Sequence, residues 1–205
     1  MTVLSLLSGC TSSSRSSSRA KTTSPTATAR ADVKPAQIKP GQIRQPAVVL
    51  RFEFGSGTFS EEERTGLPET YEGTLLDALN AKAVLARDVR VLKTGEKFDA
   101  RAGVRQAREI EADHVIVVNV LIERGEMPFC SGSRRPFRVP TTRWTQTAQV
   151  IRVRDGATSV TVPDPGVALT EFEADCESPA KSRQRSRDET LTLGVETLLK
   201  RVVGP

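Results

Sequence analysis

DARAGVRQAREIEADHVIVVNVLIE, residues Asp99 to Glu123, is the stretch that decides the fold. Asp99 is a suitable N-cap, because its carboxylate can accept from the free amides of a first helical turn. Apolar residues then recur at helical spacing, and arginines and a glutamate occupy the other positions. The apolar positions are Ala100, Val104, Ala107 and Ile110. The pattern predicts an amphipathic helix that ends at Ala112-Asp113.

HVIVVNVLI, residues His114 to Ile122, follows this helix directly. The run is rich in β-branched residues and is too short to span a membrane. A run that is apolar on both faces is typical of a central strand covered on both sides. We therefore expect the flanking segments to pack against it.

The flanking patterns alternate between strand and helix. AVVLRFEF, residues 47–54, starts with an apolar run and then alternates as a strand does. A helix is expected at about Tyr71 to Ala86, and DVRVL, residues 88–92, is a short strand. Two such crossovers imply parallel neighbouring strands with helices packed on the sheet.

Gly55-Ser56-Gly57 follows the first strand, as a dinucleotide-binding loop would. Ser60 stands where the third glycine is required, and the carboxylates of Glu61, Glu62 and Glu63 would repel a phosphate. We expect a flexible turn here and no bound cofactor.

The second half of the domain has a different character. Residues 125–140 contain three prolines and three arginines, which predicts an exposed, irregular loop. Residues 143–154 form a long strand that Asp155-Gly156 turns back on itself. The return strand, residues 159–162, is interrupted at Pro163 and followed by another strand over 167–174. The chain therefore ends in an antiparallel meander and a helix, capped by Asp188, that runs to about Val203.

Residues 1–10, MTVLSLLSGC, carry a candidate lipoprotein signal. Leu7-Ser8-Gly9-Cys10 matches the bacterial lipobox, in which the cysteine thiol receives a diacylglycerol. The apolar segment before it is shorter than the usual ~7–15 residues. The true start lies upstream, or the match is a chance one. Because Thr11 and not an aspartate follows Cys10, an outer-membrane anchor facing the periplasm is expected.

Residues 11–46 form a Ser-, Thr- and Pro-rich linker that cannot bury a core and is expected to be disordered. Seven basic residues against Asp32 give this linker a net charge of +6. Since the whole chain carries +5, residues 47–205 carry −1. This distribution argues against a nucleic-acid partner. The linker charges could contact anionic lipid or cell-wall polymers, or serve only in a soluble spacer.

Two cysteines remain for the domain, Cys130 and Cys176. In an oxidising periplasm such a pair most simply forms a disulfide. These two cysteines and His114 do not make four ligands, so no metal site is expected.

This order of elements resembles the exported bacterial domains of the CsgG-like lipoproteins, the amino-terminal domain of TolB, and LpoB. The resemblance rests on AVVLRFEF, on EGTLLDALNAKAVLARDVRVL and on Glu111-Ala112-Asp113 before the apolar run, and it covers about residues 47–203. A glycine is usual where Glu111 stands. The resemblance implies a single α/β (α+β) domain with a mixed sheet, no catalytic residues, and a function in binding other envelope proteins.

The sequence thus predicts a non-catalytic, lipid-anchored envelope adaptor that docks a protein partner such as an envelope enzyme or assembly factor. Its candidate binding residues are Arg134, Arg135 and Arg138. The alternatives are a homo-oligomeric subunit of an assembly or secretion complex and, less favoured, a periplasmic hydrolase. No catalytic motif is present to support the hydrolase.

Overall fold

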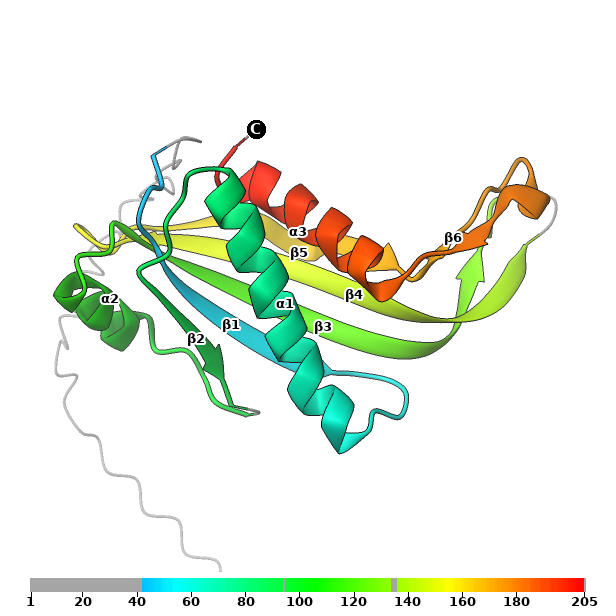
Figure 1. The fold of residues 1–205 in the computed structure, drawn as a ribbon, viewed down its shortest axis with the longest axis horizontal. Helices are drawn as coiled ribbons and strands as arrows, with labels where there is room; N and C mark the ends of the chain where they lie inside the picture. The colour runs from blue at the N-terminus through cyan, green and yellow to red at the C-terminus, as the bar shows by residue number, and fades with distance from the viewer. Residues whose placement is uncertain (1–41, 94, 134–135, 205) are drawn as a thin grey trace, which may run out of the picture. The chain divides into compact units, whose positions relative to one another are not determined.

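The structure is a computed structural model, and it describes residues 42–93, 95–133 and 136–204. Eight main elements form one α/β domain around a five-stranded mixed sheet (Figure 1). They are β1 (Ala47–Phe54), α1 (Glu61–Ala81), β2 (Asp88–Leu92), α2 (Ala100–Glu109), β3 (His114–Phe129), β4 (Phe137–Arg152), β5 (Thr158–Thr170) and α3 (Arg187–Val202). Three short elements, β6 (Phe172–Glu173), the 3₁₀ helix η1 (Pro179–Lys181) and β7 (Arg183–Gln184), lie between β5 and α3. The predicted fold class is confirmed.

The strand order of the sheet is β2-β1-β3-β4-β5. β1 pairs in parallel with β2 and with β3, as the predicted crossovers require. β3 pairs antiparallel with β4, and β4 pairs antiparallel with β5. The apolar run of β3 is therefore a central strand, as predicted.

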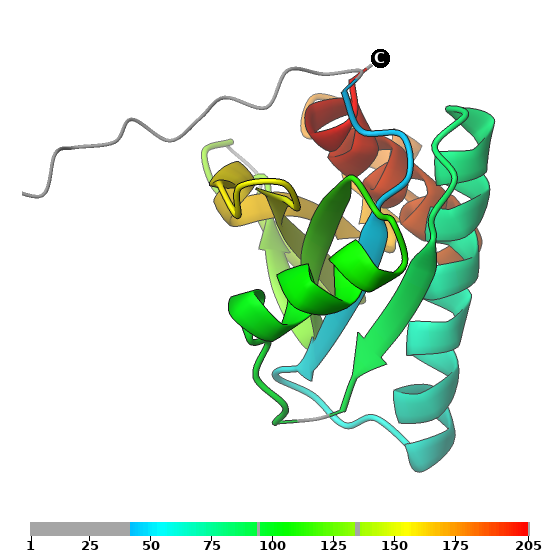
Figure 2. The ribbon, with the colours of Figure 1, turned by 90° about the vertical axis from the view of Figure 1, so that its left-hand side faces the viewer.

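Helices cover the two faces of the sheet unequally. α1 and α3 lie together on one face, and α2 lies alone on the other (Figure 2). The larger core includes Leu50, Val118 and Trp144 of the sheet with Leu75 of α1 and Leu198 of α3. The smaller core joins Val49, Val117 and Ile151 to Ala107 of α2. Alternation along β3 sends successive side chains into the two cores.

α1 begins ten residues before the predicted start. Ser60 is its N-cap, and the Ser60 hydroxyl and the Glu63 carboxylate each accept from the other residue's backbone amide. The acidic run at Glu61 is thus the first turn of a helix, where carboxylates are favourable. The predicted start at Tyr71 is therefore wrong, and Pro68 lies inside the helix. The helix ends at Ala81 and not at Ala86.

The predicted helix after Asp99 and the predicted apolar strand after it are both present, as α2 and β3. Asp99 caps α2 by accepting from the amides of Arg101 and Ala102. The helix ends at Glu109, three residues before the predicted end, because Glu111 has a φ of 57° in the left-handed region. Glycine adopts that region without steric cost, which accounts for its use at this position in the family that the sequence resembles.

Residues 125–140 are not the predicted irregular loop. β3 and β4 stay paired to Phe129 and Phe137, so only residues 130–136 connect them. Pro128 and Pro140 are tolerated because both lie beyond the ends of β1 and β5, where the hairpin has two strands only. β5 runs as one strand from Thr158 to Thr170, but residues 163–166, where the break was predicted, have no paired partner in β4.

The two ends of the domain differ slightly from expectation. Ser186, and not Asp188, is the N-cap of α3, although the predicted buried face of Leu191, Val195, Leu198 and Val202 is correct. At the other end, Ile43 is 3% exposed and belongs to the larger core. Residues 42–46, which the sequence placed in the linker, are packed on the domain.

Candidate functional site

β3 and β4 project from the domain as a two-stranded hairpin. β1 ends opposite Ile122 and β5 ends opposite Arg143, whereas the hairpin continues in register to Phe129 and Phe137 (Figure 1). An isolated two-stranded hairpin is marginally stable in water. The projection therefore needs further support, and the structure shows three sources of it.

The first support is a disulfide that joins the hairpin to a distant segment. Cys130, directly after β3, is bonded to Cys176, and their Cα atoms are 5.4 Å apart. This bond is the predicted one, and its Cα separation lies in the normal range of about 4.4–6.8 Å. The bond ties the end of the hairpin to the segment that holds β6 and β7.

The second support is a cluster of three half-buried phenylalanines. The rings of Phe129 and Phe137 are stacked with centroids 6.0 Å apart, and Phe172 meets them edge-on at 5.1 and 6.1 Å. Such pairs each contribute about 0.5–1.5 kcal/mol beyond burial. We term Phe129, Phe137 and Phe172 with the Cys130–Cys176 bond the hairpin tip.

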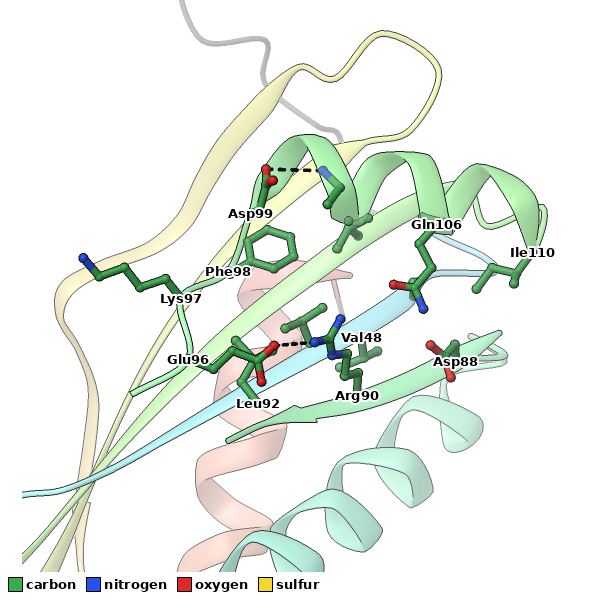
Figure 3. A pocket seen from close by; sticks show the side chains of 16 residues that line it. Val48, Asp88, Arg90, Leu92, Glu96, Lys97, Phe98, Asp99, Gln106 and Ile110 are labelled. Carbon is green, nitrogen blue, oxygen red and sulfur yellow. Dashed lines mark hydrogen bonds and ion pairs between the residues drawn. The ribbon is translucent and has the colours of Figure 1, made fainter. Parts of the chain in front are cut away.

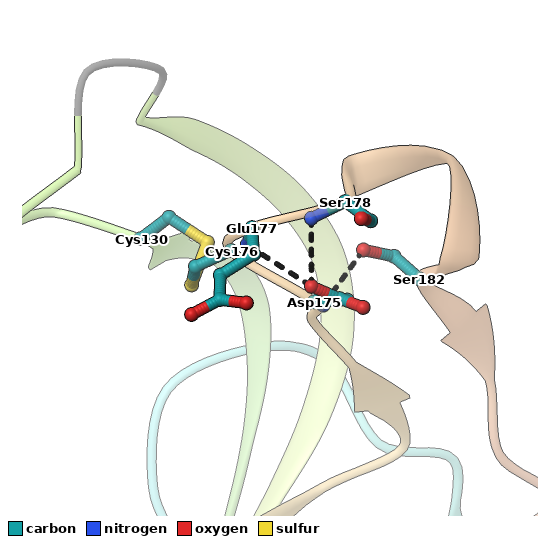
Figure 4. The surroundings of a disulfide bond; sticks show 6 residues. All are labelled: Cys130, Asp175, Cys176, Glu177, Ser178 and Ser182. Carbon is teal, nitrogen blue, oxygen red and sulfur yellow. Dashed lines mark hydrogen bonds between the residues drawn. A yellow bond between two sulfur atoms is a disulfide. The ribbon is translucent and has the colours of Figure 1, made fainter.

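The turn that carries Cys176 is held in shape by its neighbour Asp175. One carboxylate oxygen of Asp175 accepts from the backbone amides of Glu177 and Ser178, and the Asp175 amide donates to the Ser182 hydroxyl (Figure 4). The cysteine is thus presented from a fixed turn. The hairpin tip is a preformed surface.

The third support is an ion-pair network at the base of the hairpin. Both guanidinium nitrogens of Arg124 donate to the Glu63 carboxylate, at 2.7 and 3.2 Å. The hydrogen bonds from Arg124, and next that from the Ser60 amide, lower the pKa of Glu63 to about 2. Arg124 also lies 4.7 Å from the ring centroid of Phe59. The pair joins β3 to the start of α1.

The same network continues to the start of α3. Arg187 lies 3.5 Å from the Glu171 carboxylate, which also accepts from the indole nitrogen of the buried Trp144 at 3.4 Å. Arg183 and Arg185 both pair with Glu173 at 2.9 Å. Each arginine near the hairpin base therefore has an acidic partner, which suits a structural role.

Of the predicted binding arginines, only Arg138 lies among the described residues. It is on β4 and not in a loop, and it contacts Glu126 across the hairpin. Arg134 and Arg135, and the predicted lipidation residue Cys10, lie outside the described residues. The aromatic members of the hairpin tip were not predicted, although Phe129 and Phe137 lie on either side of Cys130 in the sequence and Phe172 lies shortly before Cys176.

A separate pocket of about 190 Å³ lies between α2 and strands β1 and β2 (Figure 3). Its apolar wall includes Val49, Leu92 and Phe98, and an ion pair between Arg90 and Glu96 stands beside it. The Phe98 ring lies 2.6 Å from where a Cβ of Gly103 would be, so α2 rests closely on this ring. The pocket is small, and its charged groups are paired or exposed.

The described part of the chain holds no group of three or more His, Cys, Asp or Glu side chains that could bind a metal ion. None of its helices combines the length and the apolar character that crossing a bilayer requires. The Gly55–Gly57 turn, predicted to be flexible, packs against β3: a Cβ on Gly57 would lie 2.4 Å from the Arg124 carbonyl oxygen.

No protein-family model and no curated protein matches the sequence. Several solved structures are similar in fold. The PelC dodecamer of Paraburkholderia phytofirmans is 15% identical, with 81% of this chain and 93% of that chain covered and a TM-score of 0.38. Lipoprotein GNA1162 of Neisseria meningitidis is 12% identical, with 78% and 100% covered and a TM-score of 0.33.

A minor lipoprotein of Acinetobacter baumannii is 14% identical, with 76% of this chain and 88% of that chain covered and a TM-score of 0.28. The solved structures that are similar in fold thus include bacterial lipoproteins. Likeness at this level assigns no partner and no activity. The finer resemblance to CsgG-like, TolB and LpoB domains stays a prediction.

Proposed function

We propose that this protein is a lipid-anchored, non-catalytic adaptor on the periplasmic face of the bacterial envelope, and that it docks an envelope protein through its hairpin tip. The observation that carries the proposal is the construction of that tip. Three aromatic rings and a disulfide fix the end of a hairpin that extends beyond the rest of the sheet.

A surface that is already ordered binds a partner at a lower entropic cost than one that must be ordered on binding. Aromatic side chains are enriched at the centres of protein interfaces, where they supply much of the binding energy. Phe129, Phe137 and Phe172 are each half-buried, so part of every ring is available to a partner. The hairpin tip combines both properties.

The disulfide also bears on the compartment. Disulfides persist in oxidising compartments such as the periplasm and are rare in the cytosol. A structural bond between Cys130 and Cys176 therefore fits an exported protein. Export agrees with the lipobox at Leu7-Ser8-Gly9-Cys10 and with the linker behind it.

Attachment is tested by expressing the gene from its true start with a palmitate analogue in the medium. The wild-type chain should be labelled, and Cys10→Ala should not be. Absence of label on the wild type, or label that survives the substitution, contradicts the anchor. This assay is independent of any partner.

Docking is tested by site-specific photo-crosslinking in intact cells. A photoreactive phenylalanine analogue at Phe129, Phe137 or Phe172 should form an adduct with a second envelope protein. The same analogue at Leu85 or Val160, which are 59% and 62% exposed and distant from the tip in sequence, is the matched control. Adducts from the controls alone would refute docking through the hairpin tip.

The second candidate function is a homo-oligomeric subunit of an assembly or secretion complex. The same crosslinking separates the two functions, because adducts between two copies of this chain would favour it. The mass of the soluble chain by light scattering gives an independent measurement. A periplasmic hydrolase is the less favoured alternative.

A further inference from the structure

One surface of the domain gathers arginines that have few acidic partners. It consists of Arg101, Arg105 and Arg108 on α2 with Arg152 and Arg154 at the end of β4, and we term these five residues the basic patch. Positions 101, 105 and 108 fall on one face of the helix. The turn between β4 and β5 lies against that face, so that two adjoining pockets share Arg108 and Arg154.

The charge of the basic patch is poorly balanced. Arg152 and Arg154 both approach a single carboxylate, that of Asp155, at 3.1 and 3.5 Å. The Arg108 guanidinium donates to the Val153 carbonyl oxygen, and within the described residues Arg101, Arg105 and Arg108 form no ion pair. At the hairpin base, by contrast, every arginine of the network meets a glutamate. A domain whose net charge is −1 thus concentrates positive charge on this surface.

The pocket nearer the sheet also contains an unsatisfied polar side chain. The His114 side chain is 7% exposed, lines this pocket of about 440 Å³, and has no hydrogen-bond partner at either ring nitrogen. Its Nδ1 lies 3.2 Å from the Asp113 carboxylate, the acidic side chain that lines this pocket with it. The two ring nitrogens are buried, so the donors that this pocket offers to a ligand are its three arginines, Arg108, Arg152 and Arg154.

The place where the described chain begins indicates what covers the patch. Gln42, the first described residue, lines the same pocket as His114 and Arg108. Gln42 is the described residue nearest in sequence to Cys10, and it lies beside the patch. Phosphate groups suit several arginines at once, because a guanidinium donates two parallel hydrogen bonds to them. An anchored domain would meet lipid phosphates from this side.

We infer that the basic patch docks the domain on the phosphate headgroups of anionic membrane lipids. This inference rests on the proposed lipid anchor for its orientation, but the contact itself does not require the lipid on Cys10. The patch would hold one end of the domain at the bilayer. Partner binding at the hairpin tip would then take place at a fixed orientation.

The test uses the full chain with Cys10→Ser, so that no covalent lipid contributes. Partitioning is measured by sedimentation with phosphatidylcholine vesicles that contain about 30% or no phosphatidylglycerol, at about 0.1 M salt. The patch variant is Arg101→Gln/Arg105→Gln/Arg108→Gln. The control is Lys93→Gln/Lys181→Gln/Lys200→Gln, which removes the same charge from exposed side chains elsewhere and retains the linker.

The patch variant should bind anionic vesicles about tenfold to a hundredfold more weakly than the parent chain, since each basic residue at the surface contributes to binding. The control variant should lose less than about threefold, and neutral vesicles should bind none of the proteins. Glutamine retains helix propensity, and the double variant Arg101→Gln/Arg105→Gln leaves the Arg108 hydrogen bond intact. It should show an intermediate loss.

Equal losses for the patch and control variants would mean that only total charge matters, and they would overturn the inference. Unchanged binding by the patch variant would do the same. A dimer that the patch variant alone abolishes would assign the surface to a second copy instead. Vesicle binding without palmitate label on Cys10 in cells would refute the anchor and leave the patch standing, so the two failures are distinguishable.

Discussion

Glu63 and Arg124, which are 61 positions apart in the chain, form a bidentate ion pair that joins the first turn of α1 to β3. The Arg124 guanidinium also lies over the ring of Phe59, which is in the loop between β1 and α1. The pair sits where the hairpin leaves the domain. Four predictions concern this pair and three other contacts that the tertiary structure creates.

The Glu63–Arg124 pair should make the free energy of unfolding depend on pH in the acidic range. The folded pKa of Glu63 is about 2, below its ordinary value of 4.5, so the contribution is present above pH 4.5 and lost as the pH falls toward 2. The side chains are 26% and 34% exposed, so solvent screening limits the contribution to about 1 kcal/mol. Urea unfolding should show Glu63→Gln less stable than the parent at pH 7, with the difference vanishing near pH 2. A difference independent of pH would contradict this assignment.

Loss of the disulfide should weaken the whole domain. Cys130 and Cys176 are 46 positions apart, and the chain-entropy model gives about 4 kcal/mol for a loop of that length. The variant Cys130→Ser/Cys176→Ser should therefore lose about 2–4 kcal/mol of unfolding free energy, measured by urea denaturation. Cys10→Ser is the matched control and should leave the midpoint unchanged. Equal midpoints for all three proteins would show that the bond does not support the fold.

The segment before β1 should be part of the folding unit. Ile43 is 3% exposed, and the Asp113 carboxylate accepts from the amides of Arg44 and Gln45 at 2.7 and 3.2 Å. A chain that begins at Ala47 should be about 2–5 kcal/mol less stable than one that begins at Gln42. In the full chain, Ile43→Ala should lower the free energy of unfolding by about 2–4 kcal/mol. Gln42→Ala, at an exposed site, should change that free energy by less than about 0.5 kcal/mol. Equal stability of the two truncated chains would restore residue 47 as the boundary.

Gly194 should tolerate no side chain, because the fully buried Gln146 occupies the space. A Cβ at position 194 would lie 2.2 Å from the Gln146 amide nitrogen, while the Gln146 oxygen accepts from the Tyr71 hydroxyl at 2.8 Å. Burial raises the pKa of Tyr71, so its hydroxyl stays a donor. Gly194→Ala should cost about 1–3 kcal/mol of unfolding free energy by thermal denaturation.

Gly73 is the matched control for Gly194, because it also lies in a helix and its Cβ would meet nothing within 4 Å. Gly73→Ala should raise the unfolding free energy by about 0.5–1 kcal/mol. A loss of stability for Gly73→Ala, or none for Gly194→Ala, would contradict the packing described here.

Local signals explain the parts of the site that the sequence predicted. The two cysteines were assigned to each other because only two remained for an oxidising compartment, and the structure joins them. The Ser60-to-Glu63 capping box is also a local signal, but a flexible turn was predicted there. The prolines at 128 and 140 were misleading, because a proline breaks a strand only where a neighbouring strand needs its N–H.

The sequence by itself determined the order of elements, the central strand, the buried face of α3 and the pairing of the two cysteines in the disulfide. Each of these depends on periodicity or composition within a short window, which the chain carries wherever it is placed. Only the tertiary structure decided that Phe172 meets Phe129 and Phe137, that Glu63 meets Arg124, and that Arg152 and Arg154 join the arginines of α2. These contacts depend on strand register and on the face to which each helix returns, and such long-range geometry leaves no local pattern to read.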